Sequence, residues 1–235
     1  MFELPSIMIN FKTYTQASGK NAEKMAIACQ EVAEETGENV SCCVQTADIH
    51  RCSTAANNIP ILGQHLDIED AGGHTGKVHI KALDENGASG CLINHSEDRV
   101  PLDAIQKAIG ILDDKDMISV VCVKDEKEAR TVAKFGPDII AIEPPELIGG
   151  DVSVTSADPE IISRTLEAVE GINKNIPVLC GAGVKTGADV KKALELGSSG
   201  VLVASGVTKA SNQKKAVKEL VDGIKQAIKN KKTES

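Results

Sequence analysis

Aromatic side chains are scarce in this sequence. It has no tryptophan, one tyrosine and three phenylalanines, so aromatic residues make up 2% of the chain. Proteins that bind single-stranded nucleic acids commonly stack the bases on aromatic side chains, and this chain has few to offer. The 26 Lys and Arg residues are also outnumbered by 34 Asp and Glu residues, which gives a net charge of −8. We therefore expect no nucleic-acid partner.

Long apolar runs and metal-binding cysteine spacings are also missing. No run approaches the roughly 18 apolar residues that a membrane span needs, so we expect no membrane partner. The seven cysteines show neither the C-x-x-C spacing of a zinc site nor the framework of a small secreted protein. The first residues, MFELPSIMIN, lack the charged and apolar segments of a secretion signal. These absences predict a reduced, cytoplasmic protein without a cysteine-based zinc site.

The chain is instead rich in aliphatic and small residues, with 41% hydrophobic side chains. Short apolar runs recur along its whole length. Most of them are continuous rather than alternating, which is typical of strands covered on both faces. The runs cover residues 6–11, 40–45, 60–65, 90–94, 117–123, 138–143, 177–181 and 199–204.

Segments with a helical period lie between these runs. Apolar stripes with 3.6-residue spacing cover residues 22–33 and 217–228. Thr186 and Asp189 have the spacing of a capping box, which predicts that a helix begins there. Pro159 follows an aspartate, as at the first position of a helix.

The order of these segments predicts the fold class. Strands that alternate with helices pair in parallel through right-handed crossovers. The 235 residues hold eight such units of about 29 residues each, a length that suits a closed (β/α)8 barrel. An open doubly wound sheet is the alternative. No linker or change of composition divides the chain, so we expect a single α/β domain over residues 1–235.

Polar side chains stand where several predicted strands end. In a barrel these ends meet at one mouth, where functional groups gather. Taken singly, each residue has an ordinary structural explanation, such as an exposed lysine, a structural histidine, a loop carboxylate or a tight glycine turn. Their convergence on one mouth favours a catalytic site that binds a phosphate. The residues are Asn10 and Lys12 after the first strand, His95 after the fourth, Glu143 after the sixth, and the glycine turns 181–183 and 204–206 after the last two.

Seven segments spread over the whole chain carry a more specific pattern. They are INFKTY (9–14), QHLD (64–67), GGHTGKV (72–78), NHSEDR (94–99), IEPPELIGGD (142–151), CGAGVKTG (180–187) and VLVASG (201–206). Together they resemble the triosephosphate isomerase family, and in particular its shorter archaeal branch. The His-Ser-Glu and Glu-Pro segments are the most specific, whereas the last two recur in other phosphate-binding barrels.

The resemblance implies a TIM barrel that interconverts dihydroxyacetone phosphate and glyceraldehyde 3-phosphate through an enediolate. Glu143 would be the general base, made stronger when a lid excludes water. His95 would be an uncharged electrophile, kept neutral because it begins a helical stretch whose positive end disfavours an imidazolium. Lys12 would stabilise the negative oxygen, with Asn10 in support. Neither a metal nor an organic cofactor is implied.

The resemblance also implies how the substrate is held. The phosphate would lie on backbone N–H groups near Gly183, Ala204 and Ser205. A lid over residues 144–152 would add a further N–H group near Ile148 and close over the substrate.

A homo-oligomer is expected as well. The loop around Thr75 resembles a loop that inserts into a neighbouring subunit, although it could be an ordinary exposed loop. A dimer is therefore the minimum, and the archaeal resemblance favours a tetramer.

The sequence departs from the family's usual pattern at a few positions. Asn94 stands where most members have glycine, and Gly183 stands where bacterial and eukaryotic members have a serine that contacts the phosphate. The end of the lid reads Gly149-Gly150-Asp151 instead of the commoner Gly-Thr-Gly. Glu97 and Arg99 are expected to organise Lys12 and neighbouring groups, with an exposed ion pair as the alternative.

Two other functions fit a barrel of this kind. One is a Schiff-base aldolase, but its reactive lysine is typically on the sixth strand, where this chain has Glu143. The other is a barrel that binds a sugar phosphate without catalysis. The presence of all four polar residues, Asn10, Lys12, His95 and Glu143, argues against it.

Overall fold

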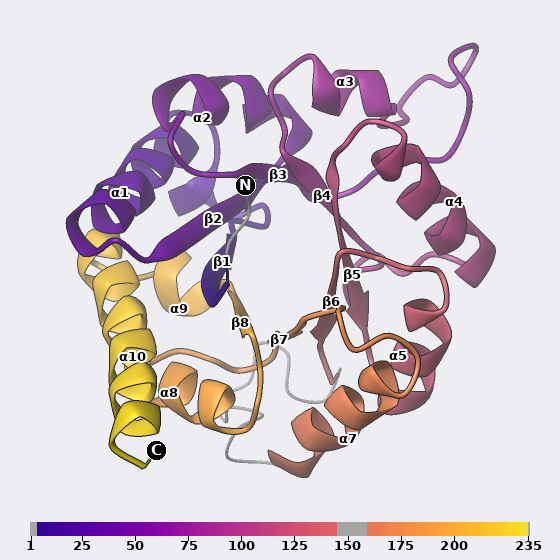
Figure 1. Ribbon diagram of the computed structural model, residues 1–235. Coiled ribbons are helices and arrows are strands. Elements are labelled where there is room, and N and C mark those ends of the chain that lie inside the picture. The colour runs from indigo at the N-terminus through magenta and orange to yellow at the C-terminus, as the bar shows by residue number, and fades with distance from the viewer. Residues whose placement is uncertain (1–3, 145–158, 235) are drawn as a thin grey trace.

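The computed structural model describes residues 4–144 and 159–234, and within them eight parallel strands close into a barrel. Each strand is followed by at least one helix, and the helices surround the barrel (Figure 1). The predicted (β/α)8 barrel is confirmed, and the open sheet is excluded because β1 pairs with both β2 and β8. The strands are β1 Ser6–Asn10, β2 Asn39–Val44, β3 Ile61–Gly63, β4 Gly90–Ile93, β5 Ile118–Val123, β6 Ile139–Ile142, β7 Val178–Cys180 and β8 Gly200–Val203.

The helices have the amphipathic character that the sequence predicts. The stripe of α1 is buried from Ala22 to Val32, and that of α10 from Val217 to Ile224, whereas Ile228 is 36% exposed. Helix α8 begins with the predicted capping box, and α7 begins at Pro159. The helices are α1 Lys20–Thr36, α2 Ile49–Ala55, α3 Ile80–Asp84, α4 Leu102–Asp113, α5 Glu126–Ala133, α7 Pro159–Glu170, α8 Gly187–Glu195, α9 Ser205–Thr208 and α10 Gln213–Glu234, with the short 3-10 turns η1 Thr15–Ala17 and η2 Thr46–Asp48.

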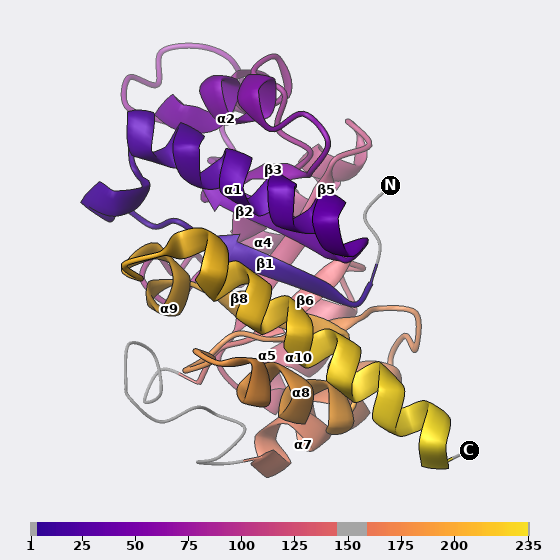
Figure 2. The same ribbon diagram turned by 90° about the vertical axis from the view of Figure 1, so that its left-hand side faces the viewer.

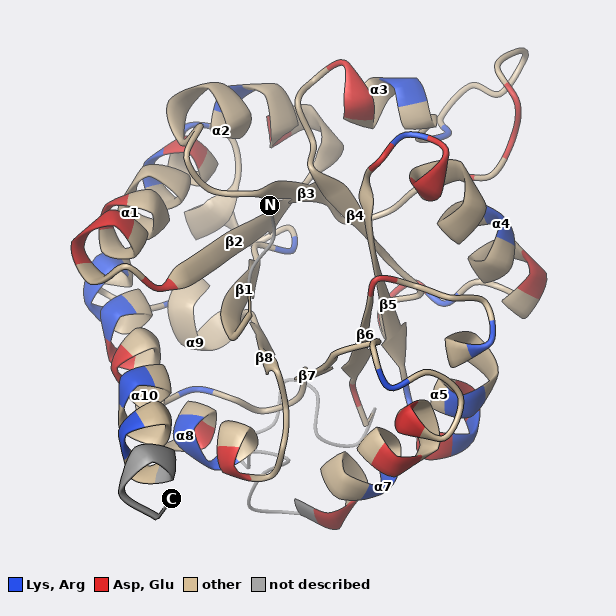
Figure 3. Ribbon diagram, viewed as in Figure 1, with Lys and Arg blue, Asp and Glu red and all other residues tan. Residues whose placement is uncertain are grey.

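Two apolar cores hold the fold together. The larger one lies between the strands and the surrounding helices. The smaller one fills the barrel with side chains from all eight strands, so the barrel is solid rather than a pore. Its members are Met8, Cys43, Leu62, Leu92, Val120, Cys122, Ile139, Ala141, Leu179 and Leu202. Charged residues lie mainly on the outer helices and loops (Figure 3).

The connections between strands and helices differ in length around the barrel. The two longest described connections follow β3 and β4, and both lead from a strand to a helix. The longest described segment of that kind follows β3 and extends away from the body beside α3 (Figure 1). None of the described helices is both long enough and apolar enough to cross a membrane.

Candidate active site

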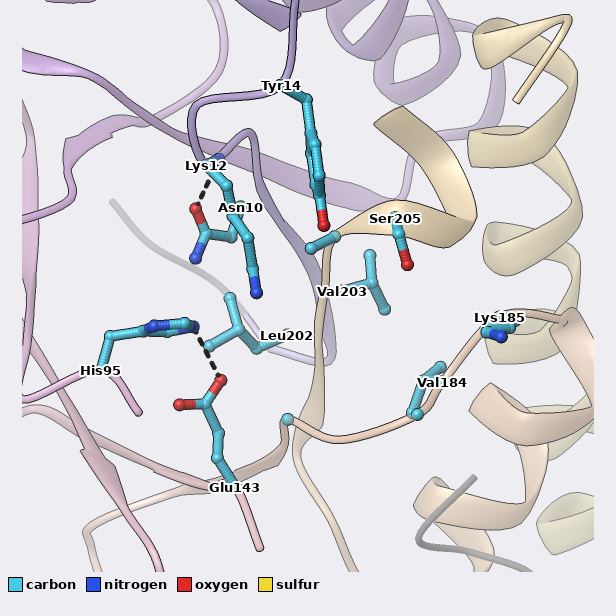
Figure 4. Close-up of a pocket in the computed structure, with 13 residues that line it drawn as sticks. Asn10, Lys12, Tyr14, His95, Glu143, Val184, Lys185, Leu202, Val203 and Ser205 are labelled. Carbon is cyan, nitrogen blue, oxygen red and sulfur yellow. Dashed lines mark hydrogen bonds and ion pairs between the residues drawn. The ribbon is translucent and has the colours of Figure 1, made fainter. Parts of the chain in front are cut away.

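A cavity opens at the carboxyl ends of the strands, where the polar residues were expected (Figure 4). Strands β1, β4, β6, β7 and β8, or the turns directly after them, all contribute to its lining. Of the predicted site residues, the cavity brings together Asn10, Lys12, His95, Glu143, Gly183, Ala204 and Ser205. Ile148 and the lid segment beyond Pro144 lie outside the described residues.

His95 and Glu143 contact each other although they are 48 positions apart in the chain. Imidazole Nε2 lies 3.3 Å from Glu143 Oε1 (Figure 4). Both side chains are nearly buried, with 9% and 3% of their surfaces exposed. The other carboxylate oxygen, Oε2, accepts a long 3.4 Å hydrogen bond from Ser96 N. A carboxylate and an imidazole from two different strands thus line one cavity.

The hydrogen bonds of His95 fix its tautomer. The backbone N–H of Glu97 donates to Nδ1 at 3.2 Å, so Nδ1 must be the unprotonated, accepting nitrogen. Glu97 Oε2 lies 3.8 Å from Nδ1, too far for a hydrogen bond. The proton of a neutral ring is therefore on Nε2, which points toward Glu143.

One part of the sequence interpretation is wrong here. His95 does not begin a helix, because α4 starts only at Leu102. Pro101 explains the delay, since the residue before a proline is disfavoured in the helical region. His95 lies instead in a turn, which is closed by a 2.8 Å hydrogen bond from Asp98 N to His95 O. The contact at Nδ1 is therefore a single backbone N–H from a turn and not the N-terminus of a helix.

Lys12 is held in an unusual backbone conformation. Its φ is +47°, a region that non-glycine residues seldom adopt. Asn10 Oδ1 accepts a hydrogen bond from Lys12 N at 2.9 Å, and Lys12 Nζ lies 2.7 Å from Glu97 Oε1. Glu97 thus pairs with Lys12, but 57% of the Glu97 side chain is exposed, so the contact also fits the alternative of an exposed ion pair. Arg99 contacts neighbouring groups instead of Lys12, since its Nη1 lies 3.1 Å from Glu128 Oε2.

Gln64 completes this corner and was not identified as a site residue from the sequence. Its Nε2 lies 3.1 Å from each of three oxygens: Asn10 Oδ1, Lys12 O and Cys43 O. It thereby supports the turn that places Lys12 over the cavity. A polar residue at the end of β3, in the segment QHLD, was the available signal, because it stands at the same kind of position as Asn10.

Gly181 and Cys122 pack around Glu143. The sequence interpretation placed Gly181 only in a phosphate-binding turn and did not consider Cys122 as a site residue. A Cβ atom on Gly181 would lie 2.7 Å from Glu143 Cγ and 3.0 Å from Ile142 O, so only glycine fits. Burial raises the pKa of the Cys122 thiol well above its usual range, and the neighbouring Glu143 carboxylate raises it further. Cys122 is therefore an uncharged thiol beneath the carboxylate.

The opposite end of the cavity is formed by the turns after β7 and β8. Gly183 has φ +69°, and Ala204 and Ser205 lie at the start of α9. Tyr14 and Lys185 also line this end. The turns and two cations, Lys12 and Lys185, suit an anionic group. Within the described parts of the chain, no three His, Cys, Asp or Glu side chains are arranged to hold a metal ion.

Fold and site together define a class: a (β/α)8 barrel with a carboxylate–imidazole pair and glycine-rich turns at the carboxyl ends of its strands. Comparison with known proteins narrows this class. The family model described as triosephosphate isomerase matches residues 5–223. This chain belongs to the triosephosphate isomerase family, a family of isomerases.

Two archaeal relatives and one solved structure illustrate the similarity. The triosephosphate isomerase of Methanothermus fervidus is 48% identical over 217 residues, which are 92% of this chain and 97% of that protein. That of Methanobacterium bryantii is 47% identical over 222 residues, covering 94% and 98%. The crystal structure of the Bartonella henselae triosephosphate isomerase superposes with a TM-score of 0.73 at 19% identity, covering 94% of this chain and 99% of that one. This last similarity shows the shared fold.

Proposed function

We propose that this protein interconverts dihydroxyacetone phosphate and D-glyceraldehyde 3-phosphate through an enediolate. The observation that carries the proposal is the contact at 3.3 Å between His95 Nε2 and Glu143 Oε1 in a cavity that also holds Lys12. The similarity to proteins named triosephosphate isomerase supports the choice of substrate.

Glu143 acts as the general base. The reaction moves hydrogen between two adjacent carbons, so one base must reach both of them. A carboxylate with two oxygens on a rotatable side chain is suited to this task. Because Glu143 contacts His95 directly, its side chain must swing away from the imidazole when a triose enters between them.

His95 acts as the electrophile. Removing a proton next to a carbonyl places negative charge on oxygen, and a neutral Nε2–H donor stabilises that charge. Our assignment of this tautomer rests on the N–H of Glu97, which occupies Nδ1. Triosephosphate isomerases are known to use a glutamate base and a neutral histidine in this way.

Lys12 supplies positive charge on the same side, and Asn10 and Gln64 hold its turn in place. The phosphate lies at the other end of the cavity, on the backbone N–H groups of Gly183, Ala204 and Ser205. Ile148 in the lid segment would add one more N–H group. No metal or organic cofactor takes part in this scheme.

The wider context belongs to the same proposal. We expect a cytoplasmic protein whose whole chain, 1–235, is one domain and which forms at least a dimer, with a tetramer favoured. The loop around Thr75 would contact the neighbouring subunit. Sedimentation equilibrium would measure the assembly, and a monomer at micromolar concentration would contradict it.

A coupled isomerase assay of the wild type and of Glu143→Gln tests the proposal. We expect activity in the wild type and a kcat roughly 10²- to 10⁴-fold lower in the variant, the usual contribution of a general base. Glu167→Gln, on the exposed face of α7, is the matched control and should keep full activity. The wild type should also exchange substrate hydrogen with deuterated water.

Two outcomes would overturn the proposal. Binding of a triose phosphate without turnover would identify a silent sugar-phosphate-binding barrel. Inactivation by borohydride in the presence of substrate, with the substrate attached to a lysine, would identify a Schiff-base enzyme.

A further inference from the structure

The loop between β4 and α4 carries His95 and is tied together by the side chain just before it. Asn94 has φ +61° and is 3% exposed. Its Oδ1 accepts a hydrogen bond from Val100 N at 3.1 Å, so the beginning and the end of the loop are joined. Its Nδ2 donates to Cys122 O in β5 at 2.9 Å. One amide therefore closes the loop and fastens it to the neighbouring strand.

Glu128, in the first turn of α5, holds the same loop from the other side. Its Oε1 lies 3.3 Å from Asn94 Nδ2, and its Oε2 lies 3.1 Å from Arg99 Nη1. Oε2 also accepts a bond from Lys124 N at 2.7 Å. The carboxylate thus bridges residues at both ends of the loop, and 16% of its side-chain surface is exposed. Partial burial makes such charged hydrogen bonds stronger than those on an open surface.

The end of β5 connects this loop to Glu143. Cys122 O accepts hydrogen bonds from the loop, from Asn94 Nδ2 and, at 3.4 Å, from Arg99 Nη1. The next carbonyl, Val123 O, accepts a bond from Glu143 N at 2.8 Å. Two successive carbonyls of one strand therefore hold the His95 loop and the backbone of Glu143. The spacing of the two ionisable side chains is set by this short stretch of β5.

We infer that Asn94 and Glu128 are positioning residues that set His95 against Glu143. The inference rests on the proposed function, because Asn94 and Glu128 would affect catalysis only by positioning His95 and Glu143. Neither side chain lines the cavity, so they act on the geometry of the pair and not on the substrate. Displacement of a catalytic group by about 1 Å can cost roughly 100-fold in rate.

Two variants separate this role from the fold. Asn94→Gly keeps the positive φ without steric cost and removes all three side-chain hydrogen bonds. Glu128→Gln keeps the shape and removes the charge that pairs with Arg99. We expect each to lower kcat by roughly 10- to 100-fold, while KM changes by less than about twofold. The double variant should lose less than the product of the two losses, because both act through one network.

The control is Glu126→Gln, two residues earlier in the same helix. Glu126 pairs with Arg164 at 3.3 Å with 52% of its side chain exposed, and its replacement should leave kcat unchanged. Urea unfolding of each variant shows how much of the protein is folded in the assay. If Asn94→Gly and Glu128→Gln lower stability but leave kcat within about twofold of the wild type, the network only supports the fold and the inference is wrong.

A second measurement is independent of substrate. In protein labelled with ¹⁵N at histidine, the wild type should show His95 with Nδ1 unprotonated and Nε2 protonated. Both variants should shift these signals or mix the two tautomers, and Glu126→Gln should not. Unchanged His95 signals in both variants would overturn the inference even if the protein proved to have another activity. Loss of the proposed function alone, by contrast, would appear as an inactive wild type with the His95 signals still sensitive to Asn94 and Glu128.

Discussion

Gly181 shows how closely the site depends on a single missing atom. Its alanine variant would place a Cβ 2.7 Å from Glu143 Cγ and 3.0 Å from Ile142 O. The carbonyl is part of the barrel and moves little, so the Glu143 side chain must give way. We expect Gly181→Ala to lower kcat by roughly 10- to 100-fold and to destabilise the protein by about 1–3 kcal/mol. Steady-state kinetics and urea unfolding would measure both.

The control for this variant is Gly136→Ala. Gly136 has φ +70° and no heavy atom within 4 Å of the added Cβ, so the substitution strains only an exposed turn. It should cost stability but leave kcat unchanged. Equal kcat in wild type and Gly181→Ala would mean that Glu143 has room to move without loss.

At this scale the sequence predicts residue types better than their contacts. Asn10, Lys12, His95 and Glu143 could be expected because they follow apolar runs that end at one mouth. The bond from Glu97 N to His95 Nδ1 could not. It depends on a turn whose conformation is set by Pro101 and by the positive φ of Asn94. The hydrophobic pattern of the sequence reveals neither the turn nor this φ.

At the scale of elements, α8 and α10 approach each other through two glycines. A Cβ on Gly223 of α10 would collide with Gly187 O at the start of α8, and one on Gly187 would collide with Glu219 O. Figure 2 shows α10 lying across α8. Since both obstacles are backbone, the helices would have to separate. We expect Gly223→Ala to lower the free energy of unfolding by about 1–3 kcal/mol in urea titrations.

Gly110→Ala is the control, and we expect it to raise the free energy of unfolding instead of lowering it. Gly110 lies within α4, and an added Cβ would meet no heavy atom within 4 Å. Alanine has a higher helix propensity than glycine, so this variant should gain up to about 1 kcal/mol. A gain in both variants would show that α10 can shift away from α8 at little cost.

The loop after β3 is closed at its base by Asp67. Asp67 N donates to Val78 O at 2.9 Å, and Val78 N donates to Asp67 Oδ2 at 2.7 Å. Partial burial would raise the pKa of Asp67, but hydrogen bonds from Lys77 and Val78 and the nearby His65 outweigh it and lower this pKa to about 2. The charged carboxylate thus stabilises the folded loop.

This pKa gives the pH dependence of the loop. A free aspartate has a pKa of about 3.9, so the folded-state pKa is the lower one. The stabilisation is fully present above about pH 4 and is lost as the pH falls toward 2. Asp67→Asn should therefore be less stable than the wild type at pH 7, with a difference that shrinks as the pH falls from 4 to 2. Asp70→Asn, at an exposed position of the same loop, should change stability by less than about 0.5 kcal/mol. A difference independent of pH would contradict the assignment.

Elements were predictable because their patterns are local, whereas their ends were not. The apolar run 138–143 includes Glu143, but β6 ends at Ile142; the N–H of Glu143 still bonds to Val123 O of β5, while its side chain lines the cavity. The run 60–65 likewise extends past β3, which ends at Gly63. Strand ends depend on neighbouring strands and on the turns that follow, and neither is visible in hydrophobicity.

At the scale of the whole molecule, closure of the barrel followed from counting strand–helix units in the available length. What counting could not supply is the packing that closure demands. At the seam between β8 and β1, a Cβ on Gly200 would collide with Ser6 O, and Gly90 meets Ile118 O in the same way between β4 and β5. The sequence shows these glycines but not that each allows two strands to approach.

The seven cysteines report on the whole fold because they are buried in elements around the barrel. They lie in α1, β2, α2, β4, β5 and β7, and all are free thiols. Burial raises the pKa of Cys180 to about 12. Burial, and then the nearby Asp48, raises that of Cys52 to about 12. The folded protein therefore keeps thiol protons that the unfolded chain loses above about pH 8.5.

This difference predicts that stability falls as the pH rises. Each retained proton lowers the free energy of unfolding by about 1.4 kcal/mol per pH unit once the unfolded thiol is ionised. Urea titrations between pH 8 and 11 should show such a decline, and Cys180→Ala should reduce its slope by one proton, because the substitution removes only the Cys180 thiol. An unchanged slope would show that the Cys180 thiol ionises equally in both states.

The burial of the cysteines also predicts how fast they react with a thiol reagent. At pH 8 the folded protein should be labelled only as fast as it unfolds globally, so that thiols in β2, β5 and β7 are modified together. Rapid labelling of Cys180 alone would show that the β7 end of the barrel opens by itself.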